Sequence, residues 1–362
     1  MTYRVYNFNP GPATLPLPVL EEAQAQLLNY REKGMSITEI SHRSREFEEI
    51  IGAAETLLLE LGGLSTAYQA LFLQGGASQQ FALVPLNFLP PEGAADYILT
   101  GSFAQKAYQE AQRLGTINVA ATTKEHDYRR IPRPEELKFS SAPAYVHITT
   151  NNTIYGTQWK YIPDTGGVPL MADMSSDIFS GETDLNRFSL LYAGAQKNLG
   201  PAGVTVVILK KDLLEKVSPD IPAILSYKTH AEARSLYNTP PVFAIYLVYL
   251  VLQWLKKQGG LPAMGKLNAR KAALIYQAID QSGGFYRGHA DAENRSNMNI
   301  TFRLPNEELE KIFVAGAAQE GLVGLKGHRS VGGIRASLYN AMPLQGAETL
   351  AQYMTAFYRQ NG

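Results

Sequence analysis

The 362-residue sequence predicts an α/β fold: a large domain with a mostly parallel sheet that is covered on both faces, plus a smaller C-terminal α+β domain. Two observations lead to this prediction. Short apolar runs bounded by turn residues alternate with helical patterns through the first two thirds of the chain, which is typical of a parallel sheet with helical crossovers. Beyond Gly259, Gly260 and Pro262 the order changes to helix, strand, helix, strands and helix, which suits a separate α+β unit.

Six apolar runs predict buried strands, because each is short and is bounded by turn residues. They cover residues 70–73, 97–100, 145–149, 170–173, 190–193 and 204–209. Helical periodicity is clearest over residues 44–61, where apolar side chains recur every three or four residues until Gly62 and Gly63 end the pattern. Further helices are predicted over residues 77–86, 102–113, 242–257, 266–281, 306–320 and 347–358, with a strand at 297–303.

These elements predict a division into three segments. Residues 1–15 form an N-terminal arm that belongs with the small domain, residues 16–258 form the large domain, and residues 259–362 form the small C-terminal domain. The chain length suits two domains, since a single domain commonly holds about 100 to 200 residues.

The composition excludes several classes of function. Lys plus Arg and Asp plus Glu both number 33, so no overall charge draws the chain to nucleic acid or to an anionic membrane. The chain has no Cys, which excludes disulfides, thiolate nucleophiles and iron–sulfur clusters. The longest apolar stretch, residues 242–252, is shorter than the about 20 residues that a membrane helix needs. We therefore expect a soluble cytoplasmic protein with no nucleic-acid or membrane partner.

Lys197 is the most specific candidate for chemistry. It lies in a run of mostly small residues, 192–201, between two predicted buried strands. Partial burial favours the neutral amine that attacks an aldehyde to form a Schiff base, and small neighbours leave room for a flat cofactor. A surface lysine in a turn is an equally good interpretation of this residue alone.

Asp173 ends the predicted strand at residues 170–173. Its presence favours the Schiff-base interpretation of Lys197 over the surface-lysine one. The carboxyl ends of parallel strands face the ligand crevice, where a buried carboxylate can keep the pyridine nitrogen of pyridoxal phosphate protonated. A loop aspartate that caps a helix is the simpler interpretation of Asp173 in isolation. Together with Lys197 further along the chain, the functional interpretation is favoured.

Gly75 and Gly76 follow a predicted strand and precede a helical pattern, which exposes backbone N–H groups at the positive end of a helix. Ser78 adds a hydroxyl donor, so this segment predicts a phosphate cradle, with an ordinary tight turn as the alternative. The glycine spacing fits neither a dinucleotide fingerprint nor a P-loop. Phe103 and Thr153 follow two other predicted strands, where they could stack on a ring or donate to an anion; core packing and a turn are the alternatives.

Two basic clusters contain histidine beside arginine. His42 and Arg43 form one, and His328, Arg329 and the following Arg335 form the other. Arginine presents paired donors that match carboxylates and phosphates, so the clusters predict a site for a small molecule with two anionic groups; solvated surface residues are the alternative. None of the six histidines shows a metal-binding spacing such as H-E-x-x-H, so no metal site is predicted.

Taken in order, these residues resemble the phosphoserine aminotransferases, a family of fold-type I, class-V enzymes that depend on pyridoxal phosphate. The similarity extends over nearly the whole chain. The matching segments are residues 7–13, 41–43, 75–76, 151–156, 172–173, 192–203, 238–241 and 327–343. The resemblance implies a fold-type I architecture in which residues 16–258 form the cofactor-binding domain.

The resemblance also implies a role for each cofactor-site residue. Lys197 would form the Schiff base with the cofactor and carry the proton, and Asp173 would pair with the pyridine nitrogen. Phe103 would stack on the ring, and Thr153 would contact it. The residues implied to hold the cofactor phosphate are Ala77, Ser78 and Gln196, with Asn238 and Thr239 of the neighbouring subunit.

For the substrate, the resemblance implies that Arg335 binds the α-carboxylate. The residues implied for the substrate phosphate or the glutamate side chain are His42 and Arg43, joined by His328 and Arg329 of the other subunit. The implied enzyme is a homodimer with active sites at the subunit interface. The implied reaction is reversible transfer of the amino group from L-glutamate to 3-phosphohydroxypyruvate, which gives O-phospho-L-serine and 2-oxoglutarate in serine biosynthesis.

Two residues depart from the family pattern. Many relatives have Trp where Phe103 stands, and some bacterial relatives have Arg where Ser78 stands. The same anion sites would also serve the 4-phosphohydroxy-L-threonine step of pyridoxine biosynthesis. An alanine–glyoxylate type aminotransferase and a noncatalytic phosphate-binding protein are further alternatives, whereas a cysteine desulfurase is excluded because it needs a thiolate.

Overall fold

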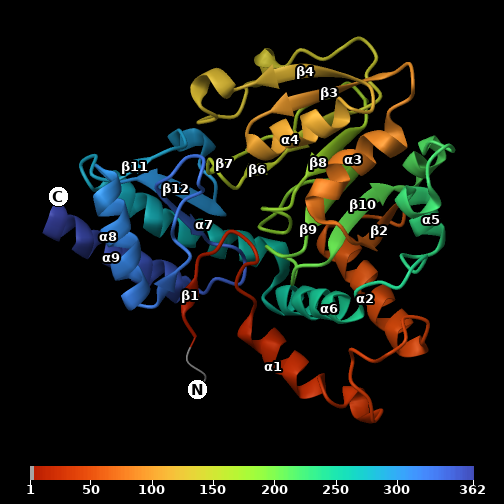
Figure 1. The fold of residues 1–362 in the computed structure, drawn as a ribbon, viewed down its shortest axis with the longest axis horizontal. Coiled ribbons are helices and arrows are strands. Elements are labelled where there is room, and N and C mark those ends of the chain that lie inside the picture. Colours follow the sequence, from red (N-terminus) through yellow and green to blue (C-terminus); the bar gives the residue numbers. More distant parts are fainter. Residues whose placement is uncertain (1–3) are drawn as a thin grey trace.

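A computed structural model describes residues 4–362, and it has a central sheet with helices on both faces and a smaller sheet beside it (Figure 1). The seven central strands lie in the order β2-β10-β9-β8-β5-β3-β4. Strands β9, β8, β5, β3 and β4 are parallel neighbours, and β10 runs antiparallel to both β2 and β9. Their bounds are Tyr68–Leu73 (β2), Ala94–Leu99 (β3), Thr116–Thr122 (β4), Val146–Thr149 (β5), Leu170–Asp173 (β8), Leu190–Gly194 (β9) and Thr205–Lys210 (β10). The prediction of a mostly parallel, doubly covered sheet is confirmed.

Apart from the edge strand β4, the central strands are mostly apolar and almost completely buried, and their side chains alternate between two cores, as the period of a strand requires. On one face Ala172 and Leu191 pack with α2 and α6, and on the other face Met171 and Tyr192 pack with α3 and α4. The covering helices are α2 (Arg45–Leu61), α3 (Gly76–Phe88), α4 (Ser102–Ala111), α5 (Tyr227–Glu232) and α6 (Val242–Lys257). Helices therefore cover both faces of the sheet.

The predicted helix over residues 44–61 is α2, and Ser44 is its cap: Ser44 Oγ accepts a hydrogen bond from the backbone N–H of Phe47 at 3.3 Å. The sequence pattern does not predict helix α1 (Leu17–Gln26) or strand β4. Helix α1 fully buries only Val19 and Ala23, so its apolar periodicity is weak. Strand β4 lies at the edge of the sheet, where exposed side chains interrupt its apolar run.

The C-terminal part of the chain has its own sheet and its own core. The three-stranded sheet has the order β11-β12-β14, and α7, α8 and α9 pack with it. The bounds are α7 Gly260–Asp280, β11 Arg287–Gly288, β12 Asn299–Arg303, α8 Glu307–Gln319, β13 Leu322–Val323, β14 Ile334–Ser337 and α9 Leu344–Asn361. The N-terminal strand β1 (Tyr6–Asn7) pairs in parallel with β13, and Phe8 joins this core. Residues 6–8 of the predicted arm, residues 1–15, thus lie beside the C-terminal elements, and residues 1–3 lie outside the described part.

Helix α7 begins at Gly260 rather than at residue 266. Gly259 precedes it with φ = 93°, and Pro262 stands in its first turn, where proline is tolerated. The glycines and the proline therefore start a helix instead of forming a linker. Leu261 packs in the core shared with α2 and α6, whereas Ile275 packs in the C-terminal core. The boundary at residues 258 and 259 stays a prediction.

Smaller elements complete the described chain. A two-stranded hairpin joins β6 (Asn151–Asn152) to β7 (Thr157–Gln158). Short 3-10 helices cover Tyr30–Glu32, Lys124–His126, Pro134–Glu136, Leu185–Arg187, Lys211–Lys216, Ala223–Leu225 and Ala292–Asn294. Within residues 4–362, none of the helices is both long and apolar enough to span a bilayer.

Lys271 is a buried cation that the sequence patterns do not reveal. It lies on α7 with 0% of its surface exposed, and its Nζ donates to the backbone oxygens of Leu338 (2.9 Å), Tyr339 (2.9 Å) and Met342 (3.0 Å). Burial lowers its pKa to about 7. These three acceptors use all three donors of an ammonium group. Helix α7 therefore anchors the turn that follows β14.

Lys271→Ala should lower the free energy of unfolding by about 3 kcal/mol, because the change leaves buried carbonyl oxygens without a donor and removes packed side-chain atoms. Denaturant unfolding of the two proteins measures the difference. The matched control is Lys266→Ala on the exposed side of the same helix, which should stay within about 0.5 kcal/mol of the unchanged protein. Equal stability of Lys271→Ala and the unchanged protein would contradict the anchoring role.

Candidate active site

The candidate residues gather where the parallel strands of the central sheet end. Asp173 is the last residue of β8, and Lys197 lies in the turn that follows β9, the neighbouring strand. Phe103 opens α4 after β3, and Gly75 and Gly76 open α3 after β2. The carboxyl ends of neighbouring parallel strands meet at one edge, which is where ligands bind in open α/β sheets.

The Lys197 amine is held by its neighbours in a partly buried position. Its Nζ donates to Thr153 Oγ1 at 2.9 Å and lies 5.6 Å from the centroid of the Phe103 ring. Burial lowers the pKa of Lys197 to about 8, although the negative charge of Asp173 opposes the shift and the positive charge of Arg335 adds to it. The site therefore favours the neutral, nucleophilic amine more than water does.

The N-terminal arm lies against the same lysine. The backbone N–H of Ala13 donates to the carbonyl oxygen of Gln196 at 2.8 Å. Gly11 has φ = 137°, and a Cβ atom there would come within 3.3 Å of Lys197 Cγ. A side chain at position 11 would thus press on the lysine and would also strain the backbone. Gly11 belongs to the matching segment of residues 7–13, but the sequence does not predict its close approach to Lys197.

Asp173 is buried, with 5% of its surface exposed. One of its oxygens accepts a hydrogen bond from the backbone N–H of Ser175 at 2.9 Å. Burial raises the pKa of Asp173, while the hydrogen bonds from Ser175 and the charge of Lys197 act in the opposite direction. A buried carboxylate of this kind is stabilised by a cationic partner placed within reach.

The glycine segment has the geometry of an anion cradle. Gly75 (φ = 86°) and Gly76 (φ = 67°) both adopt left-handed conformations, and the 13-residue helix α3 starts at Gly76 without a side-chain cap. Its first N–H groups, at Ala77 and Ser78 among others, are therefore available to an anion. Asn238 Nδ2 donates to Gln74 Oε1 at 3.2 Å, so Asn238 and its neighbour Thr239 lie beside this segment. Gln196 precedes Lys197 and is half-buried.

Arg335 lies on β14 and is 6% exposed. One of its nitrogens, Nη1, donates to the backbone oxygen of Thr153 at 3.3 Å, whereas its buried Nε has no partner in the described chain. Burial lowers its pKa. A buried guanidinium with a free donor is suited to an anionic ligand, because an unsatisfied charged donor is costly.

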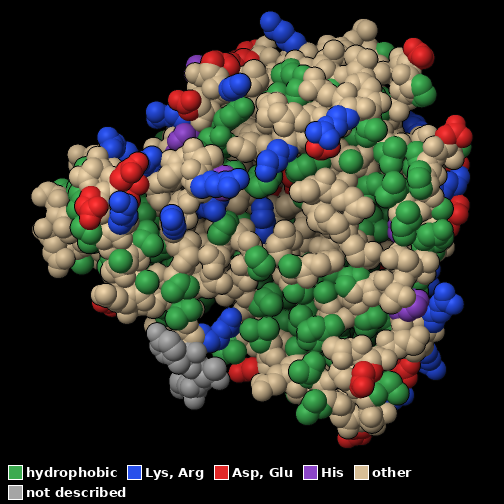
Figure 2. Space-filling model, in the orientation of Figure 1, with side chains coloured by type: hydrophobic (Ala, Val, Ile, Leu, Met, Phe, Trp, Pro, Cys, Tyr) green, Lys and Arg blue, Asp and Glu red, His purple; other side chains and the backbone are tan. Residues whose placement is uncertain are grey.

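His328 and Arg329 lie near Arg335 on the same chain. Burial lowers the pKa of His328, and the positive charges of Arg335, Arg329 and Lys106 lower it further. Figure 2 shows lysine and arginine side chains gathered near the middle of one face, where the part with β11 and β12 meets the rest of the molecule. His328, Arg329, Arg335 and Lys106 form a local basic cluster on a chain with no net charge. Lys106, which stands one helical turn after Phe103, was not among the residues predicted.

His42 and Arg43 are not brought to this cluster within one chain. They precede α2, which covers the opposite face of the central sheet from α4. No hydrogen bond or ion pair of the described residues joins either side chain to the other candidates. The contacts of the described residues therefore do not join the two predicted His–Arg pairs in the single chain.

Two further polar residues of the site were not predicted. Thr149 Oγ1 is buried without a partner in the described chain, and the sheet register sets Thr149 opposite Asp173. Tyr339 is 1% exposed, and its hydroxyl donates to the oxygen of Pro10 at 2.8 Å and accepts from Asn299 Nδ2. Strand alternation could have identified Thr149, but the contacts of Tyr339 join segments far apart in sequence.

The residues present fit pyridoxal phosphate, the cofactor that the family resemblance implies. The site combines a nucleophilic amine, a buried carboxylate and an aromatic ring beside a cradle of backbone N–H groups. The buried atoms without partners, Thr149 Oγ1 and Arg335 Nε, lie on strands of this site and are suited to a polar ligand. This arrangement can bind an aldehyde, a phosphate and a carboxylate at once. A site of this kind at the edge of such a sheet is that of an enzyme of the pyridoxal-phosphate-dependent class.

Comparison with known proteins gives the family. The model of the family described as aminotransferase class-V matches residues 5–350. The chain therefore belongs to the class-V aminotransferase family.

Within this family, the chain is similar over its full length to phosphoserine aminotransferases. The chain is 56% identical over 361 residues to the phosphoserine aminotransferase of Lysinibacillus sphaericus, and 100% of both chains is covered. It matches the structure of phosphoserine aminotransferase from Bacillus circulans subsp. alkalophilus with a TM-score of 0.98 and 54% identity over 100% of both chains. It also matches the phosphoserine aminotransferase of Trichomonas vaginalis, described with bound pyridoxal phosphate, with a TM-score of 0.92 and 38% identity over 97% of this chain and 99% of that one.

In the cofactor-free protein, Lys197 should react with an amine-acylating reagent with a midpoint near pH 8, because its pKa is lowered to about 8. Asp173→Asn should move the midpoint to lower pH, since the carboxylate favours the charged ammonium. Mass spectrometry of the Lys197 peptide across a pH series measures the midpoint, and the exposed Lys211 serves as the internal reference. A midpoint at the ordinary lysine value of about 10.4 would contradict the desolvated site.

Proposed function

We propose that this chain is a phosphoserine aminotransferase that uses pyridoxal phosphate to transfer the amino group between L-glutamate and 3-phosphohydroxypyruvate. The observation that carries the proposal is the meeting of Lys197 and Asp173 at one sheet edge, beside a phosphate cradle and a basic cluster. The full-length relatives, at more than half identity, support the same reaction.

When bound, pyridoxal phosphate supplies an aldehyde and an electron-poor ring that stabilises negative charge at the substrate α-carbon. Lys197 binds the aldehyde through its neutral amine, which a pKa of about 8 makes more abundant near neutral pH. Once released, the same amine would act as the general base that takes the substrate α-proton and as the general acid that returns it. Thr153 Oγ1, 2.9 Å from Nζ, orients the amine for both tasks.

Asp173 would hold the proton on the ring nitrogen of the bound cofactor. Its burial makes pairing with a positive charge strong, because few water molecules screen the two groups. The backbone N–H of Ser175 fixes the direction of the carboxylate. Phe103 is proposed to pack on the ring, and Ala77, Ser78 and Gln196 to bind the cofactor phosphate.

Arg335 is proposed to bind the substrate α-carboxylate through its free Nε. His328 and Arg329 lie beside it and would bind the second anion, which is the phosphate of one substrate and the side-chain carboxylate of the other. Two anion sites explain how one cluster accepts both amino acids. The same groups would accept the phosphorylated oxo acid of the pyridoxine pathway.

We propose that the enzyme acts as a homodimer and that His42 and Arg43 serve the site of the second copy. No hydrogen bond or ion pair of the described residues joins either side chain to the site of its own chain, and the substrate anion calls for more donors. His328 and Arg329 then serve their own chain, which reverses the assignment implied by the family resemblance. Asn238 and Thr239 are proposed to add contacts to the cofactor phosphate of the second copy.

The remaining assignments are proposals of the same kind. We place the boundary between the cofactor-binding domain and the small domain at residues 258 and 259, with the arm of residues 1–15 belonging to the small domain. The reaction is assigned to serine biosynthesis in the cytoplasm, and a chain without Cys suits that reducing compartment.

The purified protein supplied with pyridoxal phosphate should be yellow, and L-glutamate should bleach the colour. Subsequent 3-phosphohydroxypyruvate should restore it, and O-phospho-L-serine should bleach it again, because both amino acids fit the two anion sites. Visible absorption spectra record each step. Lys197→Ala should retain the fold, measured by circular dichroism, and lose turnover by at least about 1000-fold.

Other spectral results would indicate one of the two alternative functions. Bleaching by L-alanine but not by L-glutamate would indicate an alanine–glyoxylate type enzyme. A protein that stays colourless with added cofactor would be a noncatalytic phosphate-binding protein, and the roles of Lys197 and Asp173 would then be wrong.

A mixture of two inactive variants tests the shared site. When Lys197→Ala subunits are refolded with His42→Ala/Arg43→Ala subunits, about a quarter of the full activity should return, since half of the dimers are mixed and each holds one intact site. The control mixes Lys197→Ala with Arg335→Ala, which should recover the same fraction only if Arg335 also acts across the interface. Absence of recovery in the first mixture contradicts the assignment of His42 and Arg43 to the second copy.

A further inference from the structure

Arg303, the last residue of β12, has no part in the mechanism above. Its guanidinium joins two segments, because Nη1 donates to the backbone oxygen of Val331 at 2.9 Å and Nε donates to the Glu310 carboxylate on α8. The Glu310 side chain is only 10% exposed, so its charge needs a cationic partner close by. Arg303 is therefore held by α8 on one side and contacts the segment of Val331 on the other.

Val331 belongs to a hairpin of residues 327–333, which leads directly into β14. The hairpin is closed by backbone hydrogen bonds, among them one from the N–H of Gly332 to the oxygen of His328 at 2.8 Å. Gly332 has φ = 68°, and a Cβ atom there would come within 3.2 Å of Arg303 Nη1. Both the left-handed backbone and the close approach of the guanidinium suit glycine at this position.

The hairpin fixes the position of the proton on His328. The Nδ1 of this histidine accepts a hydrogen bond from the backbone N–H of Ser330 at 3.2 Å and lies 2.7 Å from Ser330 Oγ. A backbone N–H can only donate, so Nδ1 is an acceptor and the proton of the neutral ring is on Nε2. Within residues 4–362, this Nε2 makes no hydrogen bond, and the neighbouring Arg329 is exposed. The hairpin thus presents donors on two adjacent side chains to an anion.

The hairpin is continuous with the strand of Arg335. Beyond the base of the hairpin, the N–H of Arg335 donates to the backbone oxygen of Leu325 at 2.8 Å. In the sheet register Phe302 lies opposite Ile334, so Arg303, the next residue, lies beside the base of the hairpin. A displacement of the hairpin against β14 would therefore change the distance between the two proposed anion sites.

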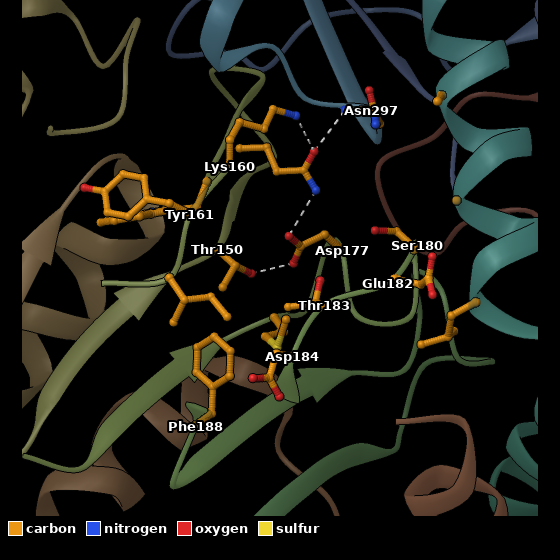
Figure 3. A pocket seen from close by; sticks show the side chains of 18 of the residues that line it. Thr150, Lys160, Tyr161, Asp177, Ser180, Glu182, Thr183, Asp184, Phe188 and Asn297 are labelled. Atoms are coloured by element: carbon orange, nitrogen blue, oxygen red, sulfur yellow. Dashed lines mark hydrogen bonds between the residues drawn. The ribbon is translucent and has the colours of Figure 1, made fainter. Parts of the chain in front are cut away.

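Strand β12 is itself fixed relative to the candidate active site. Two residues before the strand, the backbone N–H of Asn297 donates to Gln158 Oε1 at 3.2 Å (Figure 3). Within the strand, Thr301 Oγ1 donates to the backbone oxygen of Ile154 at 3.1 Å. Ile154 follows the threonine that accepts the hydrogen bond from the Lys197 amine. The end of β12 is thus a fixed point from which the hairpin is held.

We propose that Arg303 is a positioning residue for substrate binding, because its hydrogen bond to the hairpin holds His328 and Arg329 where the second anion of the substrate binds. The inference rests on the proposed function. A glycine-rich hairpin without such support samples many conformations, and ordering it on binding costs free energy. The Nε and Nη1 atoms of Arg303 are occupied by protein groups, so Arg303 acts through the hairpin and affects KM rather than kcat.

The first test compares the unchanged holoenzyme with the double variant Arg303→Leu/Glu310→Gln, which removes the link to the hairpin without leaving a buried charge unpaired. We expect KM for O-phospho-L-serine to rise at least about 10-fold and kcat to stay within about twofold, because the hairpin binds substrate and moves no proton. Steady-state kinetics measure both constants. An unchanged KM overturns the inference, and so does a loss of kcat without a change in KM.

Two further measurements do not depend on turnover. Hydrogen–deuterium exchange of the peptide with residues 327–333 should be at least about 10-fold faster in the double variant, since the hairpin loses its support. Calorimetric titration of the holoenzyme with inorganic phosphate should show binding weaker by about the same factor. Equal exchange, or equal phosphate affinity including no binding to either protein, overturns the inference. Weaker phosphate binding by the variant, with no reaction of the unchanged protein toward O-phospho-L-serine, would support the inference and refute the proposed function.

Two single variants complete the test. Arg287→Ala is the matched control, because Arg287 lies opposite Arg303 in the sheet register and donates to the backbone oxygen of Leu304 instead of to the hairpin. Its KM should stay within about twofold of the unchanged value, and a rise equal to that of the double variant overturns the inference.

Arg303→Lys keeps a cation for Glu310 but lacks the planar fork that reaches both partners at once. It should fold and should raise KM for O-phospho-L-serine at constant kcat, as the double variant does. If the double variant does not fold, Arg303→Lys decides the question by the same kinetic and exchange measurements. A KM and a rate of hairpin exchange equal to those of the unchanged protein then overturn the inference.

Discussion

The arrangement of the site depends on one electrostatic constraint, the burial of an amine near a carboxylate at the edge of a sheet. Burial alone favours neutral forms of both groups, and their mutual attraction favours charged forms. The balance leaves Lys197 with a pKa of about 8, close to the pH at which an amine must both attack and carry protons. Neighbouring parallel strands make this possible, because β8 and β9 end side by side and deliver one group each.

The surrounding structure keeps that pair in place. The N-terminal arm covers Lys197 through Gly11 and Ala13, and Tyr339 ties the arm to the sheet that carries Arg335. Lys271 anchors the turn after that sheet from α7. Each contact joins segments far apart in the sequence, so the geometry of the amine depends on the folding of the whole chain.

Sequence patterns revealed the groups whose chemistry depends on strand order. The apolar runs located β8 and β9, and this was enough to bring Asp173 and Lys197 together, because strand ends have fixed positions in a parallel sheet. The same reasoning could not place His42 and Arg43, since a turn before a helix has no fixed relation to the sheet edge. Lys271 was missed for a different reason: its burial is created by tertiary contacts, and a lysine in a helical pattern is ordinarily exposed.

Helix α7 has a consequence for the behaviour of the whole molecule. Its first turns, with Leu261 and Met264, belong to the core of the large sheet, while Ala272 and Ile275 belong to the core of the small one. Unfolding of either core would remove packing contacts from α7, and the other core also depends on the side chains of α7. The two cores should therefore lose their structure together, as one cooperative unit, even though each has a sheet of its own.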